Sequence, residues 1–296
     1  RKKLNLVSTV IPLHKYNQVA KESILSAINQ EYIENKVYVI VNSIENDLVE
    51  RIYKDFGKEI EISKINDLGV SYARNEGVRL STSEYIAFLD SDDVWYKDKL
   101  SKQIKYMTDN KHLICGTLMD YRTTNSRSKI TVGNLSDNQH FIKEARYMPF
   151  PISSLIIKKS CLDEESIFSE NLGTSLYGQI EDLEFISRLA HKFAITVFPF
   201  STGSYLLNTE GATSKEFVKQ RSASHELSKL RIRGKIDLIN DFNFTIKNTN
   251  RIKHEKLSLE LITNFIDKNY LKSLICLLIL VFTNPYLTIK KILQRL

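Results

Sequence analysis

The first 110 residues alternate between two hydrophobic periods, and this alternation constrains the fold more than any other feature of the sequence. Apolar runs typical of strands are followed by segments in which apolar residues recur at helical spacing. The strand-like runs are 5–13, 36–43, 60–65 and 84–90, and the helix-like segments between them are 17–31, 46–57 and 69–81. Strands that alternate with helices form a parallel sheet covered by helices on both faces. The sequence therefore predicts the doubly wound α/β class.

In a sheet of this class, ligands bind at the carboxyl ends of the strands, so the polar residues that follow each strand are candidates for a site. We expect four such positions to lie along one edge of the sheet. They are Pro12 to His14, Asn42 with Ser43, Asn66 with Asp67, and Asp90 to Asp93.

The last of these positions holds three aspartates within "EYIAFLDSDDVW" (84–95). In an extended segment, Asp90 and Asp92 point to the same side while Asp93 faces elsewhere. Carboxylate oxygens suit a hard divalent cation such as Mg²⁺ or Mn²⁺, which keeps waters and shares itself with substrate phosphates. The residues alone leave a second interpretation open, in which the acidic side chains only cap the strand and begin the next turn or helix.

The second half of the chain changes in both pattern and charge. Residues 111–214 mix strand-like and helix-like segments and include a polar stretch, 121–140, that we expect to form a lid or a surface loop. From Lys215 onward nearly everything is predicted to be helical, with 16 Lys and Arg against 7 Asp and Glu, a net charge of +9 that leaves −2 for residues 1–214. A boundary near residue 215 follows. The three cysteines have no paired spacing, so neither a disulfide framework nor a structural zinc site is indicated.

The basic tail also contains the apolar run "LICLLILVF" (274–282). Nine apolar residues are too few for the roughly 20 needed to span a bilayer. Positive charge and apolar area add in binding to an anionic membrane surface, so the tail is a candidate for such contact. The alternative, a hydrophobic helix packed on its own domain, stays open.

A longer stretch gives the acidic cluster a context. "NDLGVSYARNEGVRLSTSEYIAFLDSDDVW" (66–95) resembles the family 2 glycosyltransferases of the GT-A fold, in which N-x-G-x-S-x-A-R-N-x-G leads to a strand and an Asp-x-Asp motif. The resemblance covers residues 4 to about 215 and leaves the basic tail outside it. The matching positions are Gly69, Ser71, Ala73, Arg74, Asn75, Gly77 and Glu84 to Asp93.

The resemblance implies a GT-A domain over residues 1–214, with a nucleotide-binding half (1–110) and an acceptor half (111–214), followed by a helical extension (215–296). It implies an inverting, metal-dependent transferase of hexosyl or N-acetylhexosaminyl type. The donor would be a nucleotide diphosphate sugar, most often a UDP-sugar, and the acceptor a hydroxyl of a glycan or a lipid-linked glycan. Such enzymes build lipopolysaccharide or other bacterial surface polysaccharides. With the basic helical tail as the contact, the expected location is cytoplasmic and peripheral, on the inner face of the cell membrane.

Residue roles are carried over from the family in the same way. A weakly nucleophilic hydroxyl needs a carboxylate to take its proton, and the family places this base at Asp182, although the helix dipole alone also favours an acid there. Asp92 would bind Mn²⁺ or Mg²⁺, with Asn208 as a weaker second ligand. The other implied contacts are Glu181 and Trp95 with the acceptor, and Pro12, Leu13, Asn42, Arg74, Asp90 and Ser91 with the donor. Two alternatives stay open: Arg74 pairs with Asp90 structurally, and Trp95 packs beneath the strand-end loop.

The chain departs from the family pattern at two points. Asn42 and Ser43 stand where the family has a pair of acids that contact the donor base. Leu206 and Asn208 replace an arginine and a histidine of the family's tyrosine-arginine-x-histidine segment. The identity of the base and the third metal ligand therefore do not follow from the resemblance.

Two other classes of protein fit parts of the sequence. "YIAFLDSDDV" also matches the start of haloacid-dehalogenase-like phosphatases, in which Asp90 would be the nucleophile. The basic tail suits a non-catalytic module that binds nucleic acid or a membrane. Because no zinc spacing or aromatic RNA-binding motif accompanies the tail, nucleic acid is not expected as a partner.

Overall fold

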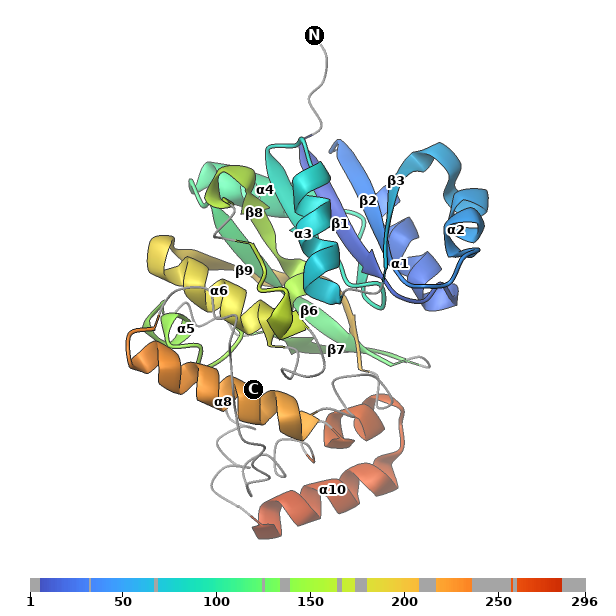
Figure 1. Ribbon diagram of the computed structural model, residues 1–296. Coiled ribbons are helices and arrows are strands. Elements are labelled where there is room, and N and C mark those ends of the chain that lie inside the picture. The colour runs from blue at the N-terminus through green and yellow to red at the C-terminus, as the bar shows by residue number, and fades with distance from the viewer. Residues whose placement is uncertain are drawn as a thin grey trace.

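The computed structural model describes residues 6–31, 33–66, 69–123, 126–133, 139–163, 167–173, 180–207, 217–235, 257 and 260–283. Within them, a nine-stranded sheet has the order β3-β2-β1-β4-β8-β6-β9-β5, with β7 beside β6 (Figure 1). The strands are β1 Val7–Leu13, β2 Asn35–Asn42, β3 Ile60–Ile65, β4 Tyr85–Phe88, β5 Val94–Trp95, β6 Ile114–Arg122, β7 Arg127–Val132, β8 Ile156–Lys158 and β9 Ile195–Leu206.

The first four strands form a parallel half-sheet with helices on both faces. Strand β1 is buried throughout and mostly apolar, because both of its faces are covered: Val7 and Ile11 pack in one core and Val10 in the other. Both cores also contain residues of the covering helices, so the doubly wound arrangement is confirmed. The helices of the first core are α1 (Gln18–Ile28), α2 (Leu48–Phe56) and α4 (Lys99–Asp109), and those of the second are α3 (Val70–Leu80), α5 (Gln139–Lys143) and α6 (Glu181–Lys192).

Parallel pairing brings the carboxyl ends of these strands to one edge. The register sets Leu13 opposite Val41 and Val10 opposite Phe88. The residues that follow β1, β2 and β4 therefore lie along the same edge of the sheet, as the sequence predicts.

Helix α3 lies against β1 because Gly77 has no side chain. A Cβ atom on Gly77 would come within 2.3 Å of Val10 Cγ1, closer than two carbon atoms can pack. Gly69, which precedes the helix, has a φ of 103°, a conformation that residues with a side chain rarely adopt. These two glycines fix the start and the depth of α3 and bury Arg74 and Asn75, which are 3% and 0% exposed.

The second half of the sheet is mixed and contains two strands that the sequence does not predict. Strand β5 pairs with β9, in a segment where the sequence favours a turn or a helix start. Strand β7 pairs with β6, inside the polar stretch 121–140 that we expected to be a lid or a surface loop. Strand β6 pairs with three other strands and joins this half to β4 through β8.

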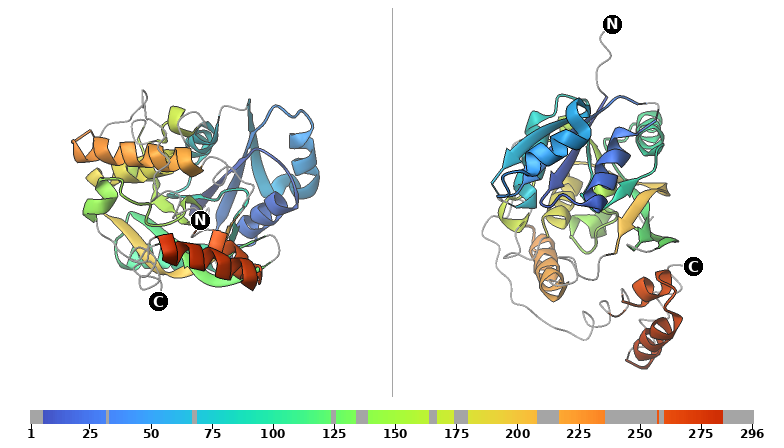
Figure 2. Two further views of the ribbon diagram at one scale, coloured as in Figure 1. Left: turned by 90° about the horizontal axis from the view of Figure 1, so that it is seen from below. Right: turned by 90° about the vertical axis from the view of Figure 1, so that its right-hand side faces the viewer.

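The helices of the C-terminal region lie below the sheet, on the side toward which β1 runs (Figure 1). They are α8 (Phe217–Ile232), a helix over 260–266, and α10 (Tyr270–Thr283), as expected for the residues described there. The right-hand view of Figure 2 also places them at this end of the molecule, and in the left-hand view, from below, they lie in front of the sheet. In the part of the chain that the structure describes, no helix is both long and apolar enough to cross a bilayer. The domain boundary near residue 215 stays a prediction, because residues 208–216 lie outside the described residues.

Candidate active site

A tight turn after β4 carries the acidic cluster and gives its three aspartates different surroundings. The N–H of Asp93 donates to the carbonyl of Asp90 at 3.1 Å, so residues 90–93 form a turn instead of the expected extended segment. Asp93 is 1% exposed, the side chain of Asp90 is 29% exposed, and Asp92 is open to solvent. The turn therefore presents two carboxylates at the sheet edge and buries the third.

Asp93 holds the turn from inside. Its Oδ1 accepts a hydrogen bond from the N–H of Leu206 at 2.9 Å, which ties the turn to the end of β9. Burial and the charges of Asp92 and Asp90 raise the pKa of Asp93 well above its ordinary value. The nearby guanidinium of Arg122 donates from Nη2 to the carbonyl of Asp92 at 2.5 Å.

Sequence reasoning missed Arg122. A signal is present, because an arginine ends an otherwise largely apolar strand, "ICGTLMDYR". The partner of that arginine lies 30 residues away in the chain, however, and only the pairing of the folded sheet shows which loop it reaches.

Arg74 joins the acidic turn to the second half of the sheet. Its Nη2 donates to Asp90 Oδ1 at 2.8 Å, and its Nη1 donates to Glu181 Oε1 at 2.8 Å. Burial alone would lower the pKa of Arg74, but the carboxylates of Asp90 and Glu181 raise it above its ordinary value. The pairing with Asp90, one of the two roles considered from the sequence, is thus present, and the contact with Glu181 adds a second anchor at the start of α6.

Asp182 follows Glu181 in the first turn of α6 and is partly exposed. The N–H of Leu183 donates to its Oδ1 at 2.7 Å. Burial raises the pKa of Asp182, the charge of Arg74 partly offsets this rise, and the charge of Asp90 adds to it. A carboxylate with a raised pKa takes a proton more readily than one in water, as a general base must.

Glu181 lies deeper than an acceptor pocket requires. It is 5% exposed, and its Oε1 is held by Arg74. Its Oε2 is buried with no hydrogen-bond partner. The contacts of Glu181 are therefore those of a residue that holds Arg74 against α6.

The expected donor-side residues line the same edge of the sheet. Pro12 and Leu13 have buried side chains at the end of β1, so a donor would meet their backbone. Asn42 is 6% exposed at the end of β2, and its carbonyl lies 2.9 Å from His14 Nδ1. Ser91 is half-buried in the acidic turn.

Trp95 is buried, and its contacts are those of the packing alternative, while its contact with an acceptor stays a prediction. The residue is 3% exposed, and its indole N–H donates to the carbonyl of Ser153 at 2.6 Å. The ammonium of Lys99 lies 4.3 Å from the centroid of the ring. Pairing of β5 with β9 draws the tryptophan under the strand-end loop, which is the packing alternative.

Asp92 is the described carboxylate that best fits a hard divalent cation. Although it opens to solvent, the surrounding protein and the charge of Asp90 raise its pKa to about 6, and a cation would favour its ionised form. No three metal-ligating side chains of His, Cys, Asp or Glu gather among the described residues. The other ligands would then be phosphate oxygens and waters, a shell that Mg²⁺ commonly keeps. Asn208, the second expected ligand, and Asp67 lie outside the described residues.

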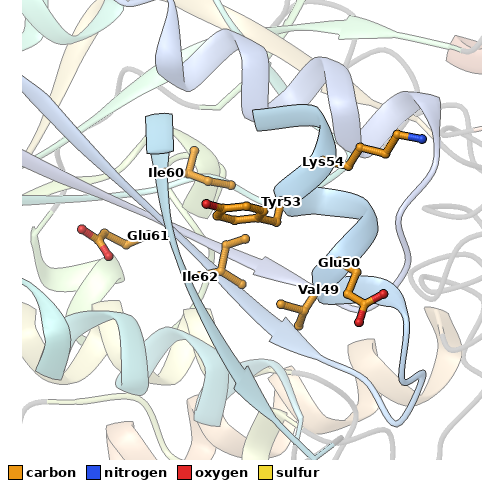
Figure 3. A pocket seen from close by; sticks show the side chains of 7 residues that line it. All are labelled: Val49, Glu50, Tyr53, Lys54, Ile60, Glu61 and Ile62. Atoms are coloured by element: carbon orange, nitrogen blue, oxygen red, sulfur yellow. The ribbon is translucent and has the colours of Figure 1, made fainter. Parts of the chain in front are cut away.

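A surface pocket of about 560 Å³ lies at the far edge of the sheet, between α2 and β3 (Figure 3). Its walls are mainly apolar, with Tyr53 facing Ile60 and Ile62. Strands β2 and β1 separate β3 from the strand that carries the acidic turn. None of the expected site residues lines this pocket, so it is not part of the candidate active site.

Comparison with solved structures supports the fold. A fragment of S. aureus TarS in complex with UDP-GlcNAc aligns with a TM-score of 0.60 and 17% identity, over 96% of this chain and 82% of that one. The same fragment in complex with UDP aligns with a TM-score of 0.58 and 16% identity, over 89% and 73%. At this level of identity the likeness shows a shared GT-A architecture, in agreement with the predicted fold.

Sequence comparison identifies relatives over part of the chain. An uncharacterized glycosyltransferase of Rickettsia bellii is 31% identical over 171 residues, 56% of this chain and 24% of that protein. The putative teichuronic acid biosynthesis glycosyltransferase TuaG of Bacillus subtilis is 30% identical over 106 residues, 34% of this chain and 42% of that protein. The chain thus spans a quarter to under a half of the length of these two relatives.

The family model for glycosyl transferase family 2 matches residues 8–160, which include the parallel half-sheet and the acidic turn. A match over more than half of the chain, together with the resemblance in the segment from Gly69 to Asp93, settles the family. The chain belongs to glycosyl transferase family 2.

Proposed function

We propose that this glycosyltransferase moves a hexosyl or N-acetylhexosaminyl group from a UDP-sugar to an acceptor hydroxyl, with inversion at the anomeric carbon. Asp182 removes the proton of the hydroxyl as that oxygen attacks the anomeric carbon, and the nucleoside diphosphate leaves. A single base acting opposite the leaving group gives inversion.

One observation carries this proposal. Arg74 binds a carboxylate of the acidic turn and a carboxylate at the start of α6 with the same guanidinium, each at 2.8 Å. The strand end that would hold the donor is therefore fixed beside the helix that would hold the base. Reacting groups held in one geometry gain much of their rate from that arrangement alone.

Asp92 would hold Mn²⁺ or Mg²⁺ through its carboxylate, with Asn208 as the further ligand carried over from the family. When bound, the cation supplies Lewis-acid stabilisation of charge on the diphosphate. Asp90 is oriented by Arg74 toward the donor side, and Asp93 and Arg122 keep the turn in shape beneath it.

The choice of donor and pathway is supported by what the similar proteins are described as binding or making. TarS has been solved with UDP and with UDP-GlcNAc, and TuaG is named for teichuronic acid biosynthesis. We extend both to this chain as a proposal: a UDP-sugar donor, and a glycan or lipid-linked acceptor in the synthesis of a bacterial surface polysaccharide or lipopolysaccharide. The site of action would be the inner face of the cell membrane, where the protein would be peripheral and cytoplasmic.

The test is a panel of UDP-sugars assayed for release of UDP, with and without Mn²⁺, in the wild type, Asp92→Ala and Asp182→Ala. We expect Asp182→Ala to lower the rate by about 10²–10⁴-fold, the contribution typical of a general base. Asp92→Ala should abolish the response to Mn²⁺. Asp109→Ala, which removes an exposed aspartate at the end of α4, is the matched control and should behave as the wild type. Equal rates in all four proteins would reject the site.

The two other classes considered from the sequence are not supported. The phosphatase interpretation is rejected because the chain belongs to a glycosyltransferase family. In addition, Asp90, which a phosphatase would use as its nucleophile, is bound by Arg74. Membership of a catalytic family also argues against a non-catalytic binding module. The basic charge and apolar run of the tail still suit contact with a membrane.

A further inference from the structure

Helix α10 presents an exposed apolar stripe. Leu271, Leu274, Ile275 and Leu278 are 71%, 52%, 48% and 48% exposed. Their spacing of three, four and seven residues places them on one face over two helical turns. Contiguous exposed apolar surface of this kind marks a site of interaction with another molecule.

The other side of the helical pair, formed by residues 260–266 and α10, is fixed to the rest of the protein. Ile262 and Ile266 are buried against Tyr121 of β6. The hydroxyl of Thr123 donates to Asp267 Oδ1 at 2.5 Å. The helix pair is therefore anchored to the sheet through residues 262–267, while the apolar stripe of α10 stays exposed.

This anchor lies next to the candidate active site along the chain. Thr123 follows Arg122, whose guanidinium donates to the carbonyl of Asp92 in the acidic turn. Figure 1 shows the pair below the sheet, on the side toward which β1 runs. Whatever covers α10 would therefore lie on the same side of the molecule as the acidic turn.

The charge of this region indicates what covers the stripe. Lys268 and Lys272 are exposed beside it, and residues 215–296 carry a net charge of +9. A second copy of the chain would bring two such positive regions together, which is unfavourable, whereas an anionic lipid surface complements them. At 14 residues, α10 is about 21 Å long, shorter than the roughly 30 Å of a bilayer core, so it would lie in the plane of the interface.

We propose that α10 docks its apolar stripe into an anionic membrane surface, with Lys268 and Lys272 at the headgroups. This inference deepens the proposed function and rests on it for the lipid-linked acceptor, but lipid binding itself requires no transferase activity. Docking would hold the edge of the sheet that carries the acidic turn near acceptors embedded in the membrane.

The experiment is co-sedimentation of the full chain with vesicles of equal parts phosphatidylglycerol and phosphatidylcholine, and with phosphatidylcholine alone. We expect binding to the anionic vesicles that weakens as salt is added. The double variant Leu271→Gln, Leu278→Gln should weaken partitioning about tenfold or more, because two large apolar side chains no longer insert. Lys268→Gln and Lys272→Gln should each weaken it roughly fivefold on anionic vesicles.

The matched control is the double variant Phe200→Gln, Ile232→Gln, which removes two apolar side chains, 63% and 55% exposed, outside the pair. It should bind vesicles as the wild type does. Release of UDP from a UDP-sugar in solution should be unchanged in all of these variants, so failure of docking and failure of the transferase proposal are separate results.

Two outcomes would overturn the inference. One is wild-type chain that stays in the supernatant with anionic vesicles. The other is a dimer in light scattering that the Leu271→Gln, Leu278→Gln variant dissociates while vesicle binding is unaffected, which would assign the stripe to a second copy.

Discussion

Helix α6 carries two buried clusters of arginine and carboxylate, and they differ in composition and surroundings. At its start, Arg74 is shared by Glu181 and Asp90, two carboxylates around one guanidinium. Later in the same turn, Glu184 is shared by Arg188 at 2.9 Å and Arg231 of α8 at 2.5 Å, so two guanidinium groups contact one carboxylate.

The first cluster has an excess of negative charge and is open at one side, where the Asp90 side chain is 29% exposed. The second is closed, with the side chains of Glu184 and Arg231 both 0% exposed. A closed cluster can only hold α8 on α6. An open cluster with unbalanced negative charge can also accept a further cation, which is what a metal and diphosphate site needs.

The largest expected effect comes from Arg74→Met, which would break the first cluster. It leaves two carboxylates without their cation, and such a loss costs about 3–5 kcal/mol of the free energy of unfolding. We also expect release of UDP to fall by about a hundredfold or more, because the start of α6 and its base lose their position. Denaturant unfolding and the UDP assay measure the two effects.

Arg79→Met is the control for this change, since Arg79 lies on the same helix and its side chain is 53% exposed. It should alter the free energy of unfolding by no more than about 0.5 kcal/mol. Arg74→Lys should recover part of the stability, because one ammonium cannot reach both carboxylates as a planar guanidinium does. Wild-type turnover in Arg74→Met would refute the idea that this residue positions the base.

Arg231→Met breaks the second cluster and should have a smaller effect. Arg188 still pairs with Glu184, so we expect a loss of about 3 kcal/mol in the free energy of unfolding, at the lower end for a buried pair. Turnover per folded molecule should not change, because the contacts described for Arg231 join α8 to α6 and do not include the acidic turn. Arg233→Met, which removes an exposed arginine two residues along, is the control and should be neutral.

The same variant tests whether α8 is held to the sheet domain through the second cluster. If Arg231→Met lowered turnover without lowering stability, the second cluster would serve catalysis and not only the attachment of α8 to α6. If α8 unfolded separately from the sheet in wild-type protein, the expected boundary near residue 215 would gain support.

Much of the parallel half could be predicted from the sequence, because its elements follow from local patterns. The apolar run of β1, the helical spacing of α1 and Gly57 at the end of α2, with its φ of 55°, are each readable within a dozen residues. The acidic turn and Asp182 were also within reach, through the resemblance of a long segment to a known family. These elements depend little on contacts between distant parts of the chain.

The features that could not be predicted depend on contacts between residues that are far apart in the sequence. Arg122 reaches the acidic turn from 30 residues away, and Arg74 reaches Glu181 across 107. Trp95 looked available to a sugar because its segment follows a polar turn. Pairing of β5 with β9 buries Trp95, and no local sequence pattern predicts a strand of two residues.

Lys99 is a buried lysine that contrasts with both arginine clusters, because its contacts among the described residues include no carboxylate. It is 0% exposed, its ammonium donates to Gln103 Oε1 at 2.7 Å, and burial lowers its pKa to about 7. Between pH 7 and about 10.5 the unfolded chain therefore binds more protons at this residue than the folded one, so Lys99 contributes a rise of the free energy of unfolding with pH in this window. The slope is at most about 1.4 kcal/mol per pH unit. Lys99→Met should remove that slope, and Lys102→Met, an exposed lysine on the same helix, should keep it. A slope that survives in Lys99→Met would mean that Lys99 stays charged in the folded protein.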